Sequence, residues 1–439
     1  MSEFMQQAVE PLATGASAWL SDLNARGKDQ WQAHRFPGRK AESWKYTNLR
    51  ALEQGDFHRK GLPVVNESAW QEQVQIADLN AWQLVFVNGQ YSEVLSSNLS
   101  VLPEGITLVR FSEASKEQRI QIRIKLDSVA IPEKHLFSAL NAAQLQDGVF
   151  LRVEKNIQLQ KPVQIVHINT LQDQAYTVHQ RVLVEMEQGS EATIVEHFAS
   201  GEDDQNSFTN GVTELCVGEN ARLHHYRLHL EHEAAIHVGS VNVALGRNAN
   251  LNSFHLGLGG KIKRLDFVVN HQGEGAHCEL NGVYLTHNSQ HIDYHTCIEH
   301  AVPLCTTNEV FRGIVGDSSR AVFNGRIHIH PQAQKTLAQL SNKNLLTSNK
   351  AEVDTKPELE IYADDVQCAH GATIAQLDST AMHYLRTRGV SEAEARVMLS
   401  FGFINELVND IKHDAIAGHL RPMLVRMFAR DDALMRHLV

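Results

Sequence analysis

The sequence predicts a mainly β protein with a β-solenoid core flanked by N-terminal and C-terminal helical regions. A long central stretch carries short apolar runs, a glycine motif recurs within it, and helical periodicity is confined to the two ends. With 439 residues, 43% of them hydrophobic, the chain is long enough for a large core. We divide it into a mixed, largely helical region (1–115), a β core (116–377) and a C-terminal helical domain (378–439).

The solenoid prediction depends on a weak internal repeat. Four related tetrapeptides lie between strand-like runs, at residues 189–192, 218–221, 246–249 and 273–276, and their glycines are 29, 28 and 27 residues apart. A nearly fixed period of this length indicates stacked coils, in which each coil covers the apolar edges of its neighbours. Glycine and asparagine would form the tight corners. A β-sandwich with evenly spaced hairpins is the alternative fold.

The N-terminal region mixes helical and strand patterns. Residues 10–26 can form an amphipathic helix with Trp19, Leu20 and Leu23 on one side. Residues 84–95 predict a β-hairpin, because the dipeptide Asn-Gly separates two apolar runs.

Beyond residue 377 the pattern is helical. One helix spans residues 379–388 and ends at Gly389, and residues 391–394 form a capping box that opens a second helix. A third helical stretch, 414–438, is expected to be interrupted near Gly418 and Pro422. The exposed faces of this tail make it a candidate docking module for a partner.

Composition excludes several classes of function. The net charge of −11 argues against a nucleic-acid binder, and no apolar run approaches the roughly 20 residues that span a bilayer. The five cysteines are scattered and odd in number, which predicts reduced thiols in a cytoplasmic protein. No secretory signal, phosphate-binding loop, dinucleotide fingerprint, HExxH or GxSxG motif is present, so no turnover chemistry is indicated.

The segment DDVQCAHGAT at residues 364–373 is the strongest candidate site. On a strand, Cys368 and His370 would share one face, since side chains alternate with a period of two. A thiolate and an imidazole at this spacing can bind iron or zinc. The simpler interpretation is a buried cysteine beside a histidine that is satisfied by the backbone.

The chain has 25 histidines, and other groups offer weaker metal sites. Histidines at adjacent positions, His224 and His225, would face opposite sides of a strand and are poor joint ligands. For each of the other groups, ordinary hydrogen bonding of the histidines is the simpler interpretation. These groups are His291, Asp293, His295 and Cys297 with His300 nearby, and His328 with His330.

Five irregular segments together resemble one known family. They are FPGRKAESWKYT at 36–47, SNKNLL at 341–346, AEVDTKPEL at 351–359, residues 364–373, and YLRTRG at 384–389. They resemble the SufB/SufD family of iron–sulfur cluster assembly scaffolds over nearly the whole chain. The resemblance implies a right-handed parallel β-helix core with helical flanks. It also implies a complex with SufB, on the last strands, and with two copies of the ATPase SufC, on the C-terminal helices.

Within that family the chain is closer to SufD than to SufB. It has Cys368, Ala369 and His370 where SufB has Glu-His-Glu, and it has no cysteine between Cys305 and Cys368, where SufB places its cluster-binding thiol. The resemblance therefore implies that His370 takes part in cluster formation at the SufB interface, with Cys368 as a nearby candidate ligand. It implies a transient iron–sulfur cluster shared with SufB, and it leaves open whether the complex binds reduced flavin.

These inferences lead to a non-catalytic scaffold whose ATPase activity resides in the SufC partner. Two other hypotheses stay open: an independent β-helix enzyme acting on polysaccharides, and a histidine-rich metal-binding protein. The final strands of an open solenoid also expose unpaired backbone groups. We therefore expect the isolated chain to form a homodimer through residues around 342–365.

Overall fold

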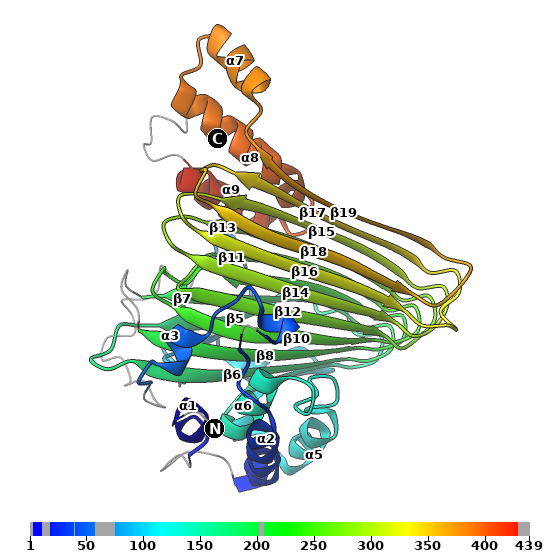
Figure 1. Cartoon of the computed structure of the whole chain (residues 1–439). Coiled ribbons are helices and arrows are strands. Elements are labelled where there is room, and N and C mark those ends of the chain that lie inside the picture. The colour runs from blue at the N-terminus through cyan, green and yellow to red at the C-terminus, as the bar shows by residue number, and fades with distance from the viewer. Residues whose placement is uncertain (1–2, 11–17, 39, 58–74, 202–205, 429–439) are drawn as a thin grey trace.

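The dominant feature of the computed structural model is a solenoid of two parallel β-sheets (Figure 1). The structure describes residues 3–10, 18–38, 40–57, 75–201 and 206–428. Strands of the core alternate between a ten-stranded and a nine-stranded sheet, so each coil contributes one strand to each. From β6 to β19, each strand pairs in parallel with the strand two positions earlier in the chain, as β12 does with β10 and β13 with β11. This pairing confirms the solenoid, because hairpins of a sandwich would pair antiparallel.

The strands have the following bounds. The ten-stranded sheet contains β1 (Trp82–Val87), β2 (Gln90–Ser92), β5 (Val163–Asn169), β7 (Glu191–Ser200), β9 (Arg222–His229), β11 (Asn250–Leu258), β13 (His277–Thr286), β15 (Thr306–Val315), β17 (Leu337–Leu346) and β19 (Gln367–Gln376). The nine-stranded sheet contains β3 (Ile106–Arg110), β4 (Val149–Val153), β6 (Tyr176–Met186), β8 (Ser207–Val217), β10 (Ile236–Leu245), β12 (Ile262–His271), β14 (His291–His300), β16 (Arg320–Ile329) and β18 (Glu352–Ile361).

The main core lies between the two sheets, where alternate side chains of each strand point inward. On β17, Ala338 and Leu340 are buried while Leu337 and Gln339 are exposed, as the period of two requires. The repeated motifs form the corners, as predicted. At four of these corners a residue with positive φ makes the tight turn, and only glycine or asparagine occupies the position: Gly189, Asn220, Asn248 and Gly275.

The N-terminal helices pack near the start of the solenoid (Figure 1). They are α1 (Glu3–Gln7), α2 (Ser21–Ala33), α3 (Arg50–Glu53), α5 (Lys116–Lys125) and α6 (Leu136–Gln144). Helix α6 lies against the nine-stranded sheet, and Asn141 Nδ2 donates to the carbonyls of Gln180 and Asn210, each at 2.9 Å. Because α5 and α6 precede the regular coils, the helical region extends beyond the predicted limit at residue 115.

Two predictions for this region have different outcomes. The hairpin is confirmed, since β1 and β2 pair antiparallel. The helix predicted over residues 10–26 is displaced: a 3₁₀ turn at Ala18–Leu20 precedes α2, which continues to Ala33. The buried Trp31 explains why α2 continues beyond residue 26. Its ring packs against Phe4 and Phe137, and its indole N–H donates to the carbonyl of Met5. Residues 11–17 lie outside the described part.

The C-terminal tail forms α7 (Ser379–Thr387), α8 (Glu392–Asn409) and α9 (Asp414–Phe428). The capping box of Ser391 and Glu394 is present as predicted. The predicted interruption is wrong, because α9 runs through Gly418 and Pro422 without a break. Leu420 and Leu424 flank the proline and are fully buried, and this burial outweighs the backbone hydrogen bond that proline removes. The last predicted residues, 429–438, lie outside the described part.

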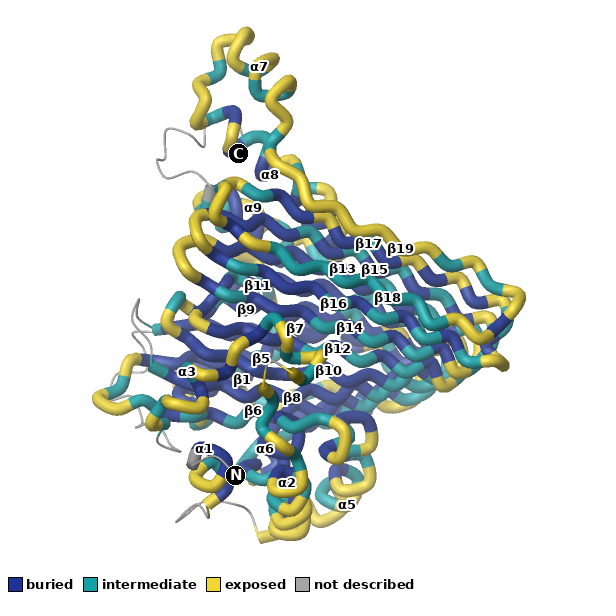
Figure 2. The backbone as a smooth tube through the Cα atoms, viewed as in Figure 1, coloured by how far each residue is buried: buried dark blue, intermediate teal, exposed yellow. Residues whose placement is uncertain are grey.

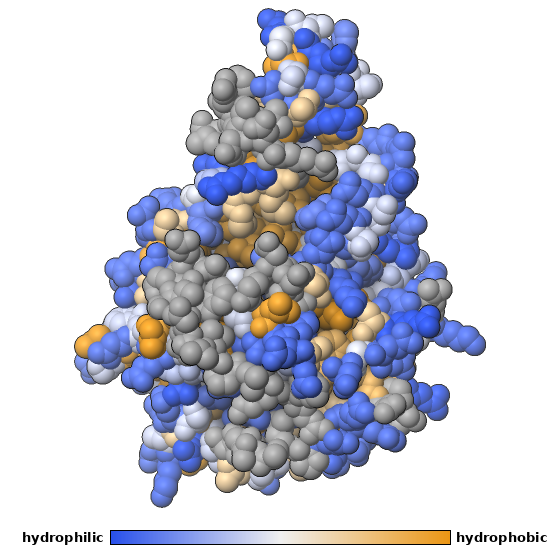
Figure 3. Space-filling model, turned by 90° about the vertical axis from the view of Figure 1, so that its left-hand side faces the viewer, coloured by the Kyte–Doolittle hydropathy of each residue, from blue (hydrophilic) through white to orange (hydrophobic). Residues whose placement is uncertain are grey.

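Helices α8 and α9 cover the outer face of the ten-stranded sheet. Phe401, Ile404 and Leu420 belong to one buried cluster with Tyr226 and Phe254 of the sheet. Figure 3 shows apolar surface in the upper half of the molecule, at the height of α9 in Figure 1. Helix α7 differs, because it has no buried residue and projects beyond the solenoid (Figure 1). No helix in the described ranges is both long and apolar enough to cross a membrane.

Candidate functional site

The solenoid is open at its C-terminal end. Strand β18 pairs only with β16, and β19 only with β17, so each sheet ends in an edge whose outer backbone groups have no strand partner in the described chain. Figure 2 shows these two strands as the least buried of the core. Apolar side chains are exposed there as well: Ile361 is 42% exposed, Tyr362 61% and Ile374 46%. Such an edge is a template for pairing with another chain.

The sequence of β18 suits a strand at the edge of a sheet. The backbone N–H groups of Glu352 and Tyr362 donate to carbonyls of residues 319 and 329, on the β16 side. Since N–H groups alternate along a strand, the odd-numbered residues of β18 direct theirs toward the open edge. Pro357, which has no N–H, occupies one of these odd positions. The proline therefore removes no hydrogen bond from the pairing between β18 and β16.

Cys368 and His370 lie on β19 and point to the same face, as predicted. Their register partners on β17 are Ala338 and Leu340, which are buried between the sheets. Both side chains therefore project toward the interior at its open end. Cys368 is half-buried and packs against the main core, whereas His370 is exposed because no further coil covers it.

The local chemistry of this pair is incomplete for metal binding. Partial burial raises the pKa of the Cys368 thiol, which keeps it protonated in the isolated chain. In the described ranges, Cys368 and His370 belong to no group of three close metal-binding side chains. A tetrahedral iron or zinc site needs more donors than this strand offers. A full ligand set at the open end therefore requires donors from another molecule.

The structure brings His328 and His330 together with a third residue that the sequence did not indicate. Glu299 Oε2 lies 2.6 Å from His328 Nδ1 and 2.9 Å from His330 Nε2, on the outer face of the nine-stranded sheet. Burial disfavours the Glu299 carboxylate, but the hydrogen bonds from His330 and His328 outweigh this effect and lower its pKa. Arg326 also contacts Glu299, at 3.3 Å. The cluster is thus a complete ion-pair network without an added metal.

The group at residues 291–300 does not assemble as a ligand set. Asp293 is held by Arg264 at 3.1 Å and by His295 at 3.0 Å, and His291 contacts Thr47 at 2.9 Å. These contacts attach the N-terminal segment to the sheet. His300 faces the opposite way from His291 and is fully buried inside the solenoid. The adjacent residues His224 and His225 also face opposite sides, as predicted: His225 is buried at 2.9 Å from Glu196, and His224 is half-buried.

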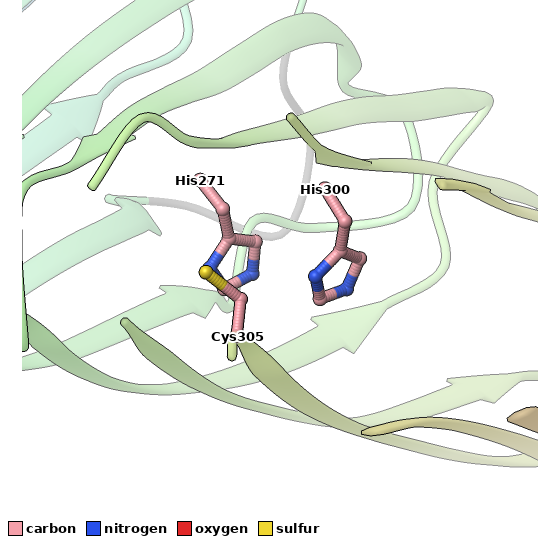
Figure 4. Close-up of side chains that lie close together, drawn as sticks. All are labelled: His271, His300 and Cys305. Carbon is pink, nitrogen blue, oxygen red and sulfur yellow. The ribbon is translucent and has the colours of Figure 1, made fainter. Parts of the chain in front are cut away.

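Two further clusters of potential ligands are buried inside the solenoid. One consists of His229, Glu231 and His237, with Lys263 Nζ 3.5 Å from the carboxylate. The other consists of His271, His300 and Cys305 (Figure 4). The members of the first cluster lie within eight positions of one another, at residues 229–237, whereas those of the second are spread over residues 271–305. A signal was nevertheless present for the second, because His271 and His300 are separated by 29 residues, the length of one coil.

Comparisons with known proteins match nearly the whole chain. A model described as the SufBD core domain of SUF system FeS cluster assembly matches residues 168–403, and a model of the SufBD protein N-terminal region matches residues 1–165. The chain is 31% identical over 394 residues to an iron–sulfur cluster assembly SufBD family protein of Synechocystis, covering 88% of this chain and 86% of that protein.

Two relatives carry a more specific name. The iron–sulfur cluster assembly protein SufD of Escherichia coli is 31% identical over 387 residues, which cover 87% of this chain and 86% of that protein. The SufD protein of Bacillus subtilis is 26% identical over 435 residues, 97% of this chain and 96% of the relative.

Proposed function

This chain belongs to the SufBD family of iron–sulfur cluster assembly proteins, and we propose that it is the SufD-type scaffold subunit of a SufBCD complex. The observation that carries the proposal is the open end of the solenoid. It combines two unpaired strand edges, exposed apolar side chains and an incomplete pair of metal ligands. An incomplete ligand pair at a pairing edge is expected where a site is shared between two chains.

In this proposal a SufB-like chain pairs with the open edges, and iron and sulfide assemble between the two subunits. His370 is the iron ligand supplied by this chain, since its imidazole is exposed at the end of the interior. Cys368 supplies a second donor once iron or a partner's cation favours its thiolate. The iron–sulfur cluster is the cargo of the assembly, and it leaves for an acceptor protein.

The C-terminal helices provide the proposed contact with a SufC-like ATPase. Helix α7 is the suitable element, because it has no buried residue and Tyr384 on it is 57% exposed. Helices α8 and α9 use their apolar faces on the sheet, and α8 also contacts α7. The chain has no phosphate-binding loop, so we assign ATP hydrolysis to the partner and a non-catalytic role to this subunit.

The experiment that tests this function is reconstitution of the three-protein complex with His370→Ala. The substitution removes the imidazole but no strand hydrogen bond, so the complex should assemble normally and form no cluster. Cluster formation is measured by visible absorption after addition of iron and a sulfur source, and assembly by size-exclusion chromatography. His287→Ala, at an exposed solenoid corner, is the matched control and should behave as wild type. A normal cluster yield with His370→Ala would overturn the assignment.

A further inference from the structure

Three potential metal ligands meet inside the corner where β12 and β14 end. His271 and His300 are the last residues of these strands and are register partners on adjacent coils. Cys305 comes from the corner that precedes β15. One ligand atom from each residue lies within 4.8 Å of the other two, and all three residues are fully buried. Figure 4 shows the two imidazoles side by side, with the sulfur beside His271.

Hydrogen bonds account for only one nitrogen of each ring. Thr307 Oγ1 lies 3.1 Å from His271 Nε2 and 3.0 Å from His300 Nε2. The Nδ1 atoms of both histidines are buried and have no hydrogen-bond partner among the described residues. Buried polar atoms are normally satisfied. Other buried histidines, such as His197 and His255, also have a nitrogen without a partner in the described structure, so what distinguishes this cluster is that two such nitrogens lie beside a thiol. The thiol of Cys305 contacts the carbonyl oxygens of Gly273 at 3.4 Å and Pro303 at 3.5 Å, and the backbone N–H groups of Gly275 and Ala276 also interact with its sulfur.

Thr307 can set both histidines in the tautomer that a metal requires. Its hydroxyl oxygen has two lone pairs and can accept one N–H from each Nε2. Both Nδ1 atoms then carry free lone pairs. Histidines that bind metals commonly donate their second ring N–H to such an acceptor. The cluster therefore contains the ligands and also the group that orients them.

The charge state of the cluster also suits a cation. Burial holds the pKa of His271 well below its usual value and lowers that of His300 to about 4, so both rings are neutral. Burial also raises the pKa of Cys305, against the opposing effect of hydrogen bonds from the backbone N–H groups of Ala276 and Gly275. The site therefore holds no positive charge that would repel a metal ion.

The other two clusters differ in this respect. Lys263 contacts the carboxylate of the His229 cluster, and Arg326 contacts that of the Glu299 cluster. Each of these carboxylates is already neutralised by a cation of the protein. A simple packing role for His271, His300 and Cys305 would explain the ring stacking, with centroids 4.3 Å apart, and the small thiol. It would leave both Nδ1 atoms unexplained.

We propose that His271, His300 and Cys305 bind one divalent transition-metal ion, with Zn²⁺ as the ion that best fits two imidazoles and one thiolate. On binding, the Cys305 thiol loses its proton to solvent and its sulfur forms the bond to the metal. The ion connects the ends of two coils with the corner before β15. This structural role is separate from cluster assembly. The site nevertheless lies close to the open end, because Thr307 occupies the row of Cys368, two strands away, or roughly 10 Å.

Metal analysis of the full chain tests the proposal. Because the site is closed, the protein is expressed in medium supplemented with Zn²⁺, Fe²⁺ or Co²⁺ and then treated with a chelator to remove surface metal. We expect one Zn²⁺ per chain to resist the chelator, and Fe²⁺ to be retained less well. The Co²⁺ form should show thiolate-to-cobalt charge transfer in its absorption spectrum. Cys297 Sγ lies 3.5 Å from the Glu299 carboxylate, so Cys297→Ala is a control and should leave this band unchanged.

Variants separate this site from the rest of the molecule. Cys305→Ala should abolish the charge-transfer band and the retained ion, whereas Cys216→Ala, at a half-buried cysteine on β8, should keep both. Thr307 is a positioning residue, so Thr307→Val should weaken retention about tenfold or more while Thr307→Ser restores it. Circular dichroism checks that each variant is folded. A folded wild-type chain without retained metal in any medium, or an unchanged cobalt spectrum in Cys305→Ala, would overturn the proposal.

Discussion

Replacing Glu309 by glutamine is expected to stabilise the solenoid, by an amount that grows as the pH rises. Glu309 lies on β15 and is fully buried between the sheets. Its only hydrogen bond is from Thr296 Oγ1 to Oε1, at 2.6 Å, and Oε2 has no partner in the described structure. Burial raises its pKa from 4.5 to about 8, against a smaller opposing effect of the Thr296 hydrogen bond.

The size of the effect follows from proton linkage. Between pH 4.5 and 8 the folded state keeps a proton that the unfolded state has lost, so stability falls as the pH rises through this range. Each pH unit above 4.5 costs about 1.4 kcal/mol, which amounts to about 3 kcal/mol at pH 7. Glutamine has no proton to lose and keeps the acceptor for Thr296. Below pH 4.5 both side chains are neutral, and the two proteins should differ little.

Urea denaturation followed by circular dichroism measures this difference. The urea midpoints of wild type and Glu309→Gln are compared at several values between pH 4.5 and 8. Midpoints are used because a solenoid need not unfold in one step, and a midpoint requires no two-state model. The gap should widen steadily with pH. Glu274→Gln, at an exposed corner position, is the control and should follow wild type. A gap that stays constant across the range would refute the reasoning.

Three further predictions concern the surfaces of the molecule. Tyr384→Ala on the exposed helix α7 should weaken binding of the SufC-like ATPase at least tenfold without changing the circular dichroism spectrum, and calorimetry that finds equal affinity would move the docking site elsewhere. Truncation after Leu377 removes the cover of the outer sheet face, including Phe254, so the product should aggregate in size-exclusion chromatography; a monodisperse product would contradict this packing. Ile361→Pro removes an N–H at the open edge of β18. In sedimentation experiments this variant should weaken both the predicted homodimer and the pairing with a SufB-like chain. Glu360→Pro is the comparison, because it should also break the pairing with β16 and destabilise the fold. A wild-type chain that is monomeric at working concentrations would exclude the dimer.

The sequence was most informative where the chemistry is local. The corner motifs predicted the solenoid because glycine and asparagine adopt positive φ most readily, as at Gly189 and Asn220. Later corners use Leu304, Asp317 and Lys335 at positive φ, and there the glycine and asparagine signal is absent. The capping box of Ser391 and Glu394 involves only neighbouring residues and was predicted correctly. Local rules failed at Pro422, where burial of Leu420 and Leu424 against a distant sheet sustains the helix.

The same difference between local and long-range information applies to the candidate site. The alternation along residues 364–373 was enough to place Cys368 and His370 on one face, because side-chain direction in a strand has a period of two. The sequence could not show that this face is the open interior, since that depends on which coil comes last in the stack.

The sequence by itself thus determined the stacked β architecture, its corners, and the pair of potential ligands near its end. Only the tertiary structure decided which distant residues share a site. His271, His300 and Cys305 meet because the register between coils places residues about one period apart side by side. Burial likewise depends on the assembled sheets. It is burial that raises the pKa of Glu309 to about 8 and that separates both histidine Nδ1 atoms from any partner in the described structure.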